Sequence, residues 1–129
     1  DVRRELWFKF LVNCSYNAIS AIGQIEYGKM VSVHAVKTLI DTLADEVLAI
    51  AHHEKIFITK DEATSANNMI ASTMVAQRSS TAQDIARKKS TEIDFLNGLV
   101  VRKGKEYGIP TPANQSVYAL VKMIETFNH

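Results

Sequence analysis

The stretch Trp7–Asn17, with the sequence WFKFLVNCSYN, carries the strongest fold signal in the chain. Apolar residues extend this pattern over about residues 3–22, where they cover most of the circumference of a helix. A helix that is apolar nearly all round is usually buried all round. The sequence therefore predicts an N-terminal helix that other elements of the domain enclose.

Outward from this helix, most of the chain keeps the apolar spacing of helices. Two prolines and five glycines punctuate it, and it shows no strand pair, internal repeat or low-complexity tract. Further helices are expected over about 31–52, 60–77, 92–107 and 112–127, with one helical turn near 83–87. The sequence therefore predicts an all-α fold, in which residues 1–129 form a single bundle-like domain of about six helices.

Residues that favour helix ends mark several of these boundaries. Thr59 and Glu62 fit a capping box, in which the side chain of each bonds to the backbone of the other. Thr91 is placed to cap a helix whose first turn holds acids, which the helix dipole favours. Gly108 fits a C-terminal stop, and Thr111-Pro112 fits the start of the last helix.

Composition restricts the class of protein. A chain of 129 residues can fold as one domain without a metal or a disulfide. Its 15 basic and 14 acidic residues leave a net charge of +1, which gives no general electrostatic case for binding nucleic acid or an anionic membrane. The single cysteine, Cys14, excludes an intrachain disulfide and a cysteine-cluster metal site, so a reducing, cytoplasmic setting is expected.

The start of the chain suggests a piece of a larger protein. No apolar run approaches the roughly 20 residues that a membrane-spanning helix needs. The chain starts at Asp1 without an initiator methionine or a signal-peptide pattern, and a helix is already under way by Arg3. We therefore expect a cut through a longer protein.

Lys9, Asn13 and Asn17 interrupt the apolar surface of the first helix. A step of four residues rotates by only about 40°, so the three side chains form one polar stripe roughly 12 Å long. One interpretation is that the stripe faces water or satisfies neighbouring backbone. The other is that it lines a cleft and presents one cation and two amides to an anionic, oxygen-rich ligand, because a buried ammonium without a partner is costly.

Two later segments also carry polar residues that suit a ligand site. Ser79, Ser80 and the free amides of a turn could hold a carboxylate, or the serines could simply cap a helix. Glu92 could accept a hydrogen bond from a substrate hydroxyl, or act only as a first-turn acid on the helix dipole. His52 and His53 are adjacent and point in different directions, so no metal site is expected.

Taken in order, these residues closely resemble the C-terminal domain of the ketopantoate reductase (2-dehydropantoate 2-reductase) family. The motifs that carry the resemblance are Trp7-Phe8-Lys9 with Asn13 and Asn17, Ser79-Ser80 with Gln83-Asp84, Thr91–Asp94 with Asn97-Gly98, and Gly108–Asn114. Each motif is weak alone, but the set is specific and covers nearly the whole chain. The region from 29 to 67 adds little.

The resemblance implies an NADPH-dependent oxidoreductase that reduces ketopantoate to pantoate, on the route to pantothenate and coenzyme A. It implies a helical C-terminal domain of the 6-phosphogluconate dehydrogenase type. It also implies an N-terminal Rossmann domain, outside this chain, that binds most of the NADPH. The active site would lie in the cleft between the two domains. No cofactor-binding residue is assigned in this chain, and the chain alone is expected to be inactive.

By the same resemblance, Lys9 matches the catalytic lysine, the general acid toward the keto oxygen of the substrate. Asn13 and Asn17 match the asparagines that line the site and help to bind substrate. Ser80 matches the serine that holds the substrate carboxylate. Glu92 matches the glutamate that hydrogen-bonds the substrate hydroxyl.

One departure and two alternatives accompany this resemblance. Lys88-Lys89-Ser90 stands where the family commonly has Gly-Arg-Pro, so the entry to the next helix is expected to differ. The protein could reduce another branched or aromatic 2-keto acid, or it could be a helical interaction or dimerisation module without catalysis of its own. The expected partners are a small 2-keto acid, the N-terminal Rossmann domain and a second copy in a homodimer, with neither nucleic acid nor membrane.

Overall fold

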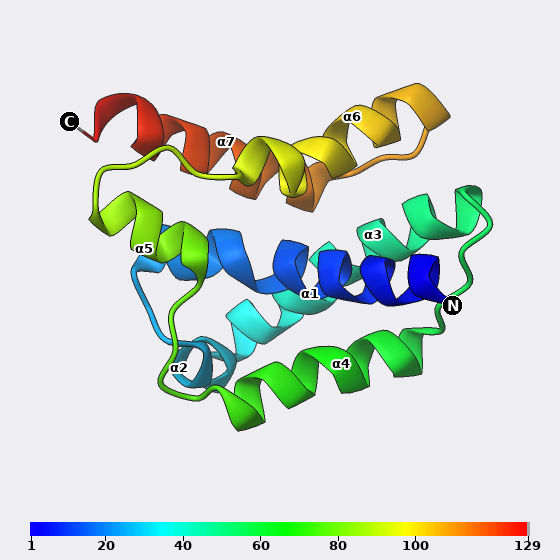
Figure 1. Ribbon diagram of the computed structural model, residues 1–129, viewed down its shortest axis with the longest axis horizontal. Helices are drawn as coiled ribbons and strands as arrows, with labels where there is room; N and C mark the ends of the chain where they lie inside the picture. The colour runs from blue at the N-terminus through cyan, green and yellow to red at the C-terminus, as the bar shows by residue number, and fades with distance from the viewer. Residues whose placement is uncertain (129) are drawn as a thin grey trace.

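A computed structural model describes residues 1–128, and all regular structure in that range is helical. The elements are α1 (Val2–Gly23), α2 (Tyr27–Ser32), α3 (His34–His53), α4 (Lys60–Thr73), α5 (Ser80–Ala86), the 3-10 helix η1 (Ile93–Phe95), α6 (Asn97–Tyr107) and α7 (Pro112–Phe127). Figure 1 shows α1 crossing the middle of the molecule, with α7 on one side and α4 on the other. The predicted all-α fold is confirmed.

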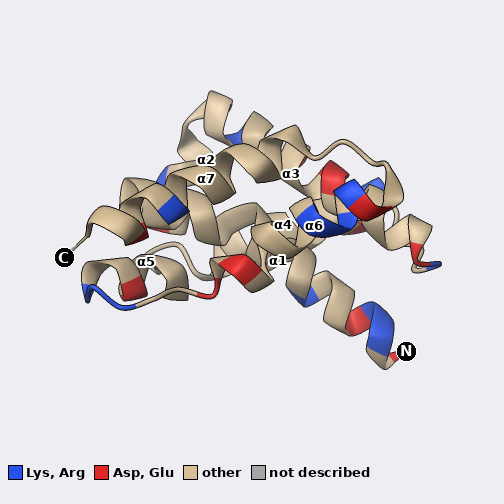
Figure 2. Cartoon of the chain, turned by 90° about the horizontal axis from the view of Figure 1, so that it is seen from above, with Lys and Arg blue, Asp and Glu red and all other residues tan. Residues whose placement is uncertain are grey.

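α1 is buried along its second half, as its apolar surface predicts. It packs against α3, α4, α5 and α7, and Leu11, Cys14 and Ala18 are fully shielded from solvent. Its first turns behave differently, because they project from the rest of the molecule (Figure 2). Leu6 there is 59% exposed, so the expectation of burial on all sides is wrong for the N-terminal end of this helix.

The helix predicted over about 31–52 corresponds to α3, which begins at His34 because Val33 is extended, and a separate short helix, α2, precedes it. The N–H groups of Tyr27 and Gly28, at the start of α2, donate to the carbonyl oxygens of Gln77 and Val75, each at 2.9 Å. Gly28 allows this approach, since a β-carbon there would lie 2.5 Å from a methyl carbon of Val75. α2 is thus bound to the segment that follows α4.

The predicted capping box at the start of α4 is confirmed. The hydroxyl of Thr59 accepts from the N–H of Glu62 at 3.1 Å, and the glutamate carboxylate accepts from the N–H of Thr59 at 3.0 Å. The other end differs, because α4 stops at Thr73 although the sequence predicts helix to about Gln77. Carbonyl groups just beyond this end bond to α2 instead of continuing the helix.

Because of tertiary packing, α6 also starts later in the chain than the sequence predicts. The hydroxyl of Thr91 accepts from the N–H of Ile93 at 3.2 Å, but only the short helix η1 follows. Ile93 and Asn97 are fully buried, and a β-carbon at Gly98 would lie 2.8 Å from the ring of Tyr118. Because Ile93 and Asn97 enter the core, the regular helix begins at residue 97 and not directly after Thr91.

α6 ends at Gly108 as predicted, with a φ of 70° that favours glycine. α7 also begins at the predicted residue, but the side chain of Thr111 forms no cap. Instead, the carboxylate of Glu46 on α3 accepts from the N–H groups of Ala113 at 3.0 Å and Asn114 at 2.9 Å. A carboxylate at this end pairs with free N–H groups and with the positive pole of the helix dipole.

Glu46 belongs to a buried polar network that joins four helices. Its carboxylate also accepts from Nδ2 of Asn114 at 2.8 Å, and Oδ1 of Asn114 accepts from Nδ2 of Asn97 at 2.8 Å. The same nitrogen of Asn97 donates to the carbonyl oxygen of Cys14 on α1 at 3.0 Å. Because buried polar groups need partners within the protein, this network fixes α3, α6 and α7 relative to α1.

Replacing Glu46 with alanine should lower the free energy of unfolding by about 3 kcal/mol, because three N–H donors lose their shared buried acceptor. Urea denaturation followed by circular dichroism measures this loss. Asp45→Ala is the matched control: this neighbouring acid pairs with Lys60 at the surface and is 57% exposed. The control should cost less than about 1 kcal/mol. Equal losses in the two variants would contradict a structural role for the buried carboxylate.

Candidate functional site

The structure places Lys9, Asn13 and Asn17 along one face of α1. Lys9 and Asn13 are exposed, whereas Asn17 is only 6% exposed. Within residues 1–128, the polar side-chain atoms of these three residues form no hydrogen bond or ion pair. Their ammonium and carboxamide groups are therefore left for solvent or for a ligand.

Two adjoining hollows contain this stripe. The outer hollow, of about 340 Å³, is lined by Phe8, Lys9, Val12, Asn13 and Ile70. The inner hollow, of about 270 Å³, is lined by Val12, Asn13, Tyr16, Asn17, Tyr27, Ile70, Met74, Gln77 and Ser80. Because Val12, Asn13 and Ile70 line both, we treat the two hollows as one groove, which starts between α1 and α4 and ends at the first residues of α2 and α5.

The chemistry of the groove changes along its length. Lys9, in the outer hollow, is the one charged residue among the described residues that line it. Asn17, Gln77 and Ser80 bring uncharged hydrogen-bonding groups to the inner hollow, and Ile70 belongs to its apolar wall. Ligand sites commonly combine an apolar lining with a few polar groups that set orientation. The groove therefore suits a small anion that carries an apolar portion.

The adjacent residues Ser79 and Ser80 have different surroundings. Ser79 is fully buried, and its hydroxyl accepts from the N–H of Ala82 and donates to the carbonyl oxygen of Asn17, both at 3.0 Å. Its own N–H donates to the hydroxyl of Ser20 at 3.0 Å. Ser79 is thus the cap of α5, as the capping alternative predicts. Ser80 is exposed and lines the inner hollow, so it is the serine available to a ligand.

Glu92 lies apart from the groove. It is exposed, it precedes η1, and it lines neither hollow. η1 packs against α6 and α7. The structure therefore brings Lys9, Asn13, Asn17 and Ser80 to one groove, while the role of Glu92 stays a prediction.

Two tyrosines line the inner hollow with their rings edge to face, 5.2 Å apart. The hydroxyl of Tyr16 donates to the carbonyl oxygen of Asn67 at 2.7 Å. Burial raises the pKa of Tyr16 to about 12, and the negative charge of Asp41 contributes in the same direction. Burial also raises the pKa of Tyr27. Both phenols are therefore protonated at neutral pH, and each can donate a hydrogen bond.

Sequence reasoning missed several residues of the inner hollow, namely Tyr27, Ile70, Met74 and Gln77. They belong to α2, to α4 and to the segment beyond α4. The apolar periodicity of α4 marks Ile70 as an inward-facing residue, but it does not show what that residue faces. No local pattern connects the other three with α1.

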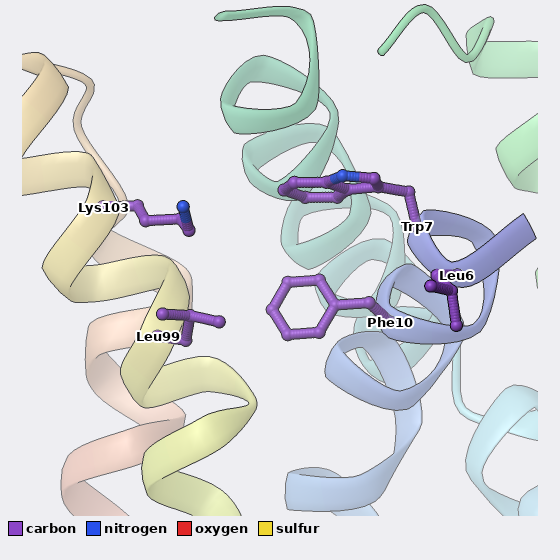
Figure 3. A pocket seen from close by; sticks show the side chains of 5 residues that line it. All are labelled: Leu6, Trp7, Phe10, Leu99 and Lys103. Carbon is purple, nitrogen blue, oxygen red and sulfur yellow. The ribbon is translucent and has the colours of Figure 1, made fainter. Parts of the chain in front are cut away.

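A separate hollow of about 260 Å³ lies on another side of α1. It is lined by Leu6, Trp7, Phe10, Leu99 and Lys103 (Figure 3). Lys103 forms an ion pair with Glu54, which also accepts from the hydroxyl of Tyr107 at 2.7 Å. Burial opposes ionisation of Glu54, but the hydrogen bonds from Lys103 and Tyr107 hold its pKa below the usual value. The positive charge of Lys103 is thus already balanced by Glu54, so this hollow does not suit an anionic ligand.

Comparisons with known proteins show the family to which the chain belongs. Residues 1–125 match the family described as the C-terminal domain of ketopantoate reductase PanE/ApbA. The chain is 34% identical over 125 residues to the 2-dehydropantoate 2-reductase of Vibrio cholerae, a match that covers 97% of this chain and 42% of the relative. It is also 34% identical over 126 residues to that of Pyrobaculum aerophilum, covering 98% of this chain and 45% of the relative.

Solved structures share the fold. A PanE/ApbA family ketopantoate reductase from Ralstonia eutropha superposes with a TM-score of 0.94 and 46% identity, over 99% of this chain and 43% of its own. A D-mandelate dehydrogenase with NADH and anilino(oxo)acetate superposes with a TM-score of 0.90 and 26% identity, over 98% of this chain and 42% of its own. The chain therefore spans less than half the length of these relatives. It belongs to the PanE/ApbA ketopantoate reductase family and corresponds to the C-terminal domain of that family.

Proposed function

We propose that this chain is the substrate-binding and proton-donating domain of an NADPH-dependent 2-dehydropantoate 2-reductase, which reduces ketopantoate to pantoate on the route to pantothenate and coenzyme A. The groove carries the proposal. Along it lie an ammonium group and two carboxamides that have no partner within residues 1–128, and Ser80 lies at its inner end. Membership of the reductase family supports the reaction class.

Reduction of a ketone places negative charge on the carbonyl oxygen. Lys9 lines the outer hollow, and its ammonium group forms no ion pair within the described residues, so it is available to stabilise that charge. It can then donate the proton that completes the alcohol, as a general acid. When bound, the nicotinamide cofactor supplies the hydride for this reaction.

The remaining polar residues bind and orient the substrate. Asn13 lines both hollows, so its carboxamide lies next to the expected position of the keto group. Asn17 and Ser80 lie farther along, in the inner hollow, and offer donors to the carboxylate of the 2-keto acid. A substrate held at two points in this way presents its carbonyl carbon in a defined orientation.

The described residues do not form a dinucleotide-binding fold of their own. Residues 1–128 contain no strand, and the sequence has no glycine-rich phosphate loop. We therefore assign no cofactor-binding residue in this chain and place the NADPH mainly on an N-terminal Rossmann domain of the full-length protein. The isolated chain is expected to be inactive.

The proposed setting is the cytoplasm. Cys14 is a buried free thiol, which suits a reducing compartment. In the range 1–128, no helix has both the length and the apolar character needed to cross a bilayer. The proposed partners are a small 2-keto acid and the N-terminal domain of the same protein, and a homodimer stays a prediction.

A second candidate function is reduction of another branched or aromatic 2-keto acid. It is favoured by the structural similarity to a D-mandelate dehydrogenase that was solved with anilino(oxo)acetate. Oxidation of NADPH by the full-length protein, measured with ketopantoate, 2-oxoisovalerate and phenylglyoxylate, separates the two functions. We expect the highest kcat/KM with ketopantoate, and a clear preference for another acid would establish the second function. Inactivity with all of them would favour an interaction module.

Replacing Lys9 with alanine in the full-length enzyme should lower kcat about 100-fold or more, because a positioned acid is lost. Steady-state oxidation of NADPH at saturating ketopantoate measures this effect. Lys37→Ala is the control, since Lys37 is an exposed lysine on α3 and lines neither hollow. An unchanged kcat in the Lys9 variant would remove this residue from the mechanism.

The adjacent serines provide a second test. Ser80→Ala should raise KM for ketopantoate about tenfold with little loss of stability, because a donor to the carboxylate is removed. Ser79→Ala should instead lower the free energy of unfolding by about 1–2 kcal/mol, because the cap of α5 is lost. Kinetics and thermal denaturation of both variants give the comparison. The opposite pattern would show that Ser80 is structural.

A further inference from the structure

Tyr27 lines the inner hollow, and no described residue uses its hydroxyl. Tyr27 is 7% exposed and lines this hollow. Within residues 1–128, its hydroxyl forms no hydrogen bond. The hydroxyl is also not among the unpartnered polar atoms that are sealed from solvent. Some of its surface is therefore accessible, and the inner hollow is the space beside it.

The position of Tyr27 is well determined by its surroundings. Its backbone N–H donates to the carbonyl oxygen of Gln77 at 2.9 Å, and its ring packs edge to face on Tyr16. The residue is thus fixed in place, while its hydroxyl has a donor that no described residue accepts. An acceptor on a ligand in the inner hollow can take this donor in place of water.

The groups around this hydroxyl indicate the kind of acceptor. Asn17, Gln77 and Ser80 line the same hollow, and all three carry uncharged donors, while no lysine or arginine lines it. A carboxylate has two oxygens with about four acceptor positions, so it needs several donors when no cation is present. Burial raises the pKa of Tyr27, so the phenol is protonated and can donate at neutral pH.

We propose that Tyr27 is a substrate-binding residue, whose hydroxyl donates a hydrogen bond to the carboxylate of the 2-keto acid at the inner end of the groove. This inference rests on the proposed function and adds a residue to it. The keto group of the same substrate then lies toward Asn13 and Lys9, so that the two ends of the molecule are held by α2 and α1.

Tyr16 offers a matched control, because it has the same side chain in the same hollow with a different hydrogen bond. Its hydroxyl donates to the carbonyl oxygen of Asn67 on α4, so it acts within the protein. Replacement of either tyrosine by phenylalanine keeps the ring contact and removes only the hydroxyl. The pair therefore separates an oxygen that binds substrate from one that stabilises the fold.

The experiment uses the full-length reductase with the variants Tyr27→Phe and Tyr16→Phe. For Tyr27→Phe we expect KM for the 2-keto acid to rise about tenfold or more, with kcat and KM for NADPH unchanged, because binding to the carboxylate is lost equally in the ground and transition states. Its melting temperature should be unchanged, since the hydroxyl has no partner within residues 1–128. Tyr16→Phe should lower the melting temperature, because its hydroxyl no longer donates to the carbonyl oxygen of Asn67.

A further measurement locates the contact on the substrate. The primary amide of the product 2-hydroxy acid lacks the carboxylate, so its inhibition constant should differ little between wild type and Tyr27→Phe, whereas that of the acid should rise about tenfold. An equal rise for acid and amide would overturn the proposed contact. So would an unchanged KM, or a melting temperature that falls in Tyr27→Phe as it does in Tyr16→Phe.

Failure of this inference is distinguishable from failure of the proposed function. If the wild-type enzyme reduces a 2-keto acid and Tyr27→Phe behaves like wild type, only the role of Tyr27 is wrong. If the wild-type enzyme reduces no 2-keto acid, the proposed function is wrong, and the carboxylate contact that rests on it is wrong as well.

Discussion

The buried network of Glu46, Asn114 and Asn97 is the interaction on which the rest of the structure depends. It runs from the carboxylate on α3 through two asparagine side chains to the carbonyl oxygen of Cys14 on α1. Asn97 and Asn114 are fully buried and Glu46 is largely buried, so each bond among them restricts where its helix can lie. α1 is therefore held in a fixed position, while the stripe formed by its lysine and two asparagines stays free of partners within residues 1–128.

The groove is completed by hydrogen bonds between segments that are distant in sequence. The hydroxyl of Ser79 donates to the carbonyl oxygen of Asn17, which brings the start of α5, and with it Ser80, next to the stripe. The backbone bond from Tyr27 to Gln77 brings α2 to the end of α4 in the same way. Hydrogen-bonding groups from several helices are thus held together by bonds within the protein, which lowers the cost of ordering them around a ligand.

Much of the fold and part of the site are predictable from local sequence. The stripe on α1, the capping box at Thr59 and the stop at Gly108 follow from helix geometry and backbone preferences, which neighbouring residues determine. Other features are not local. Val33 takes an extended conformation within the second predicted helix, and the separate helix α2 before it bonds through Tyr27 and Gly28 to the segment after α4. Glu46, and not Thr111, caps α7 because it lies beside that helix only after folding.

By itself, the sequence determined that Lys9, Asn13 and Asn17 share one face of a helix, because a fixed rotation per residue converts their spacing into direction. Only the tertiary structure decided which other polar groups share their groove. It distinguished Ser80 from its buried neighbour, left the hydroxyl of Tyr27 without a partner among residues 1–128, and placed Glu92 outside the groove. The physical reason is that these relations depend on how helices pack across the core, and the spacing of residues within a single helix carries no information about that.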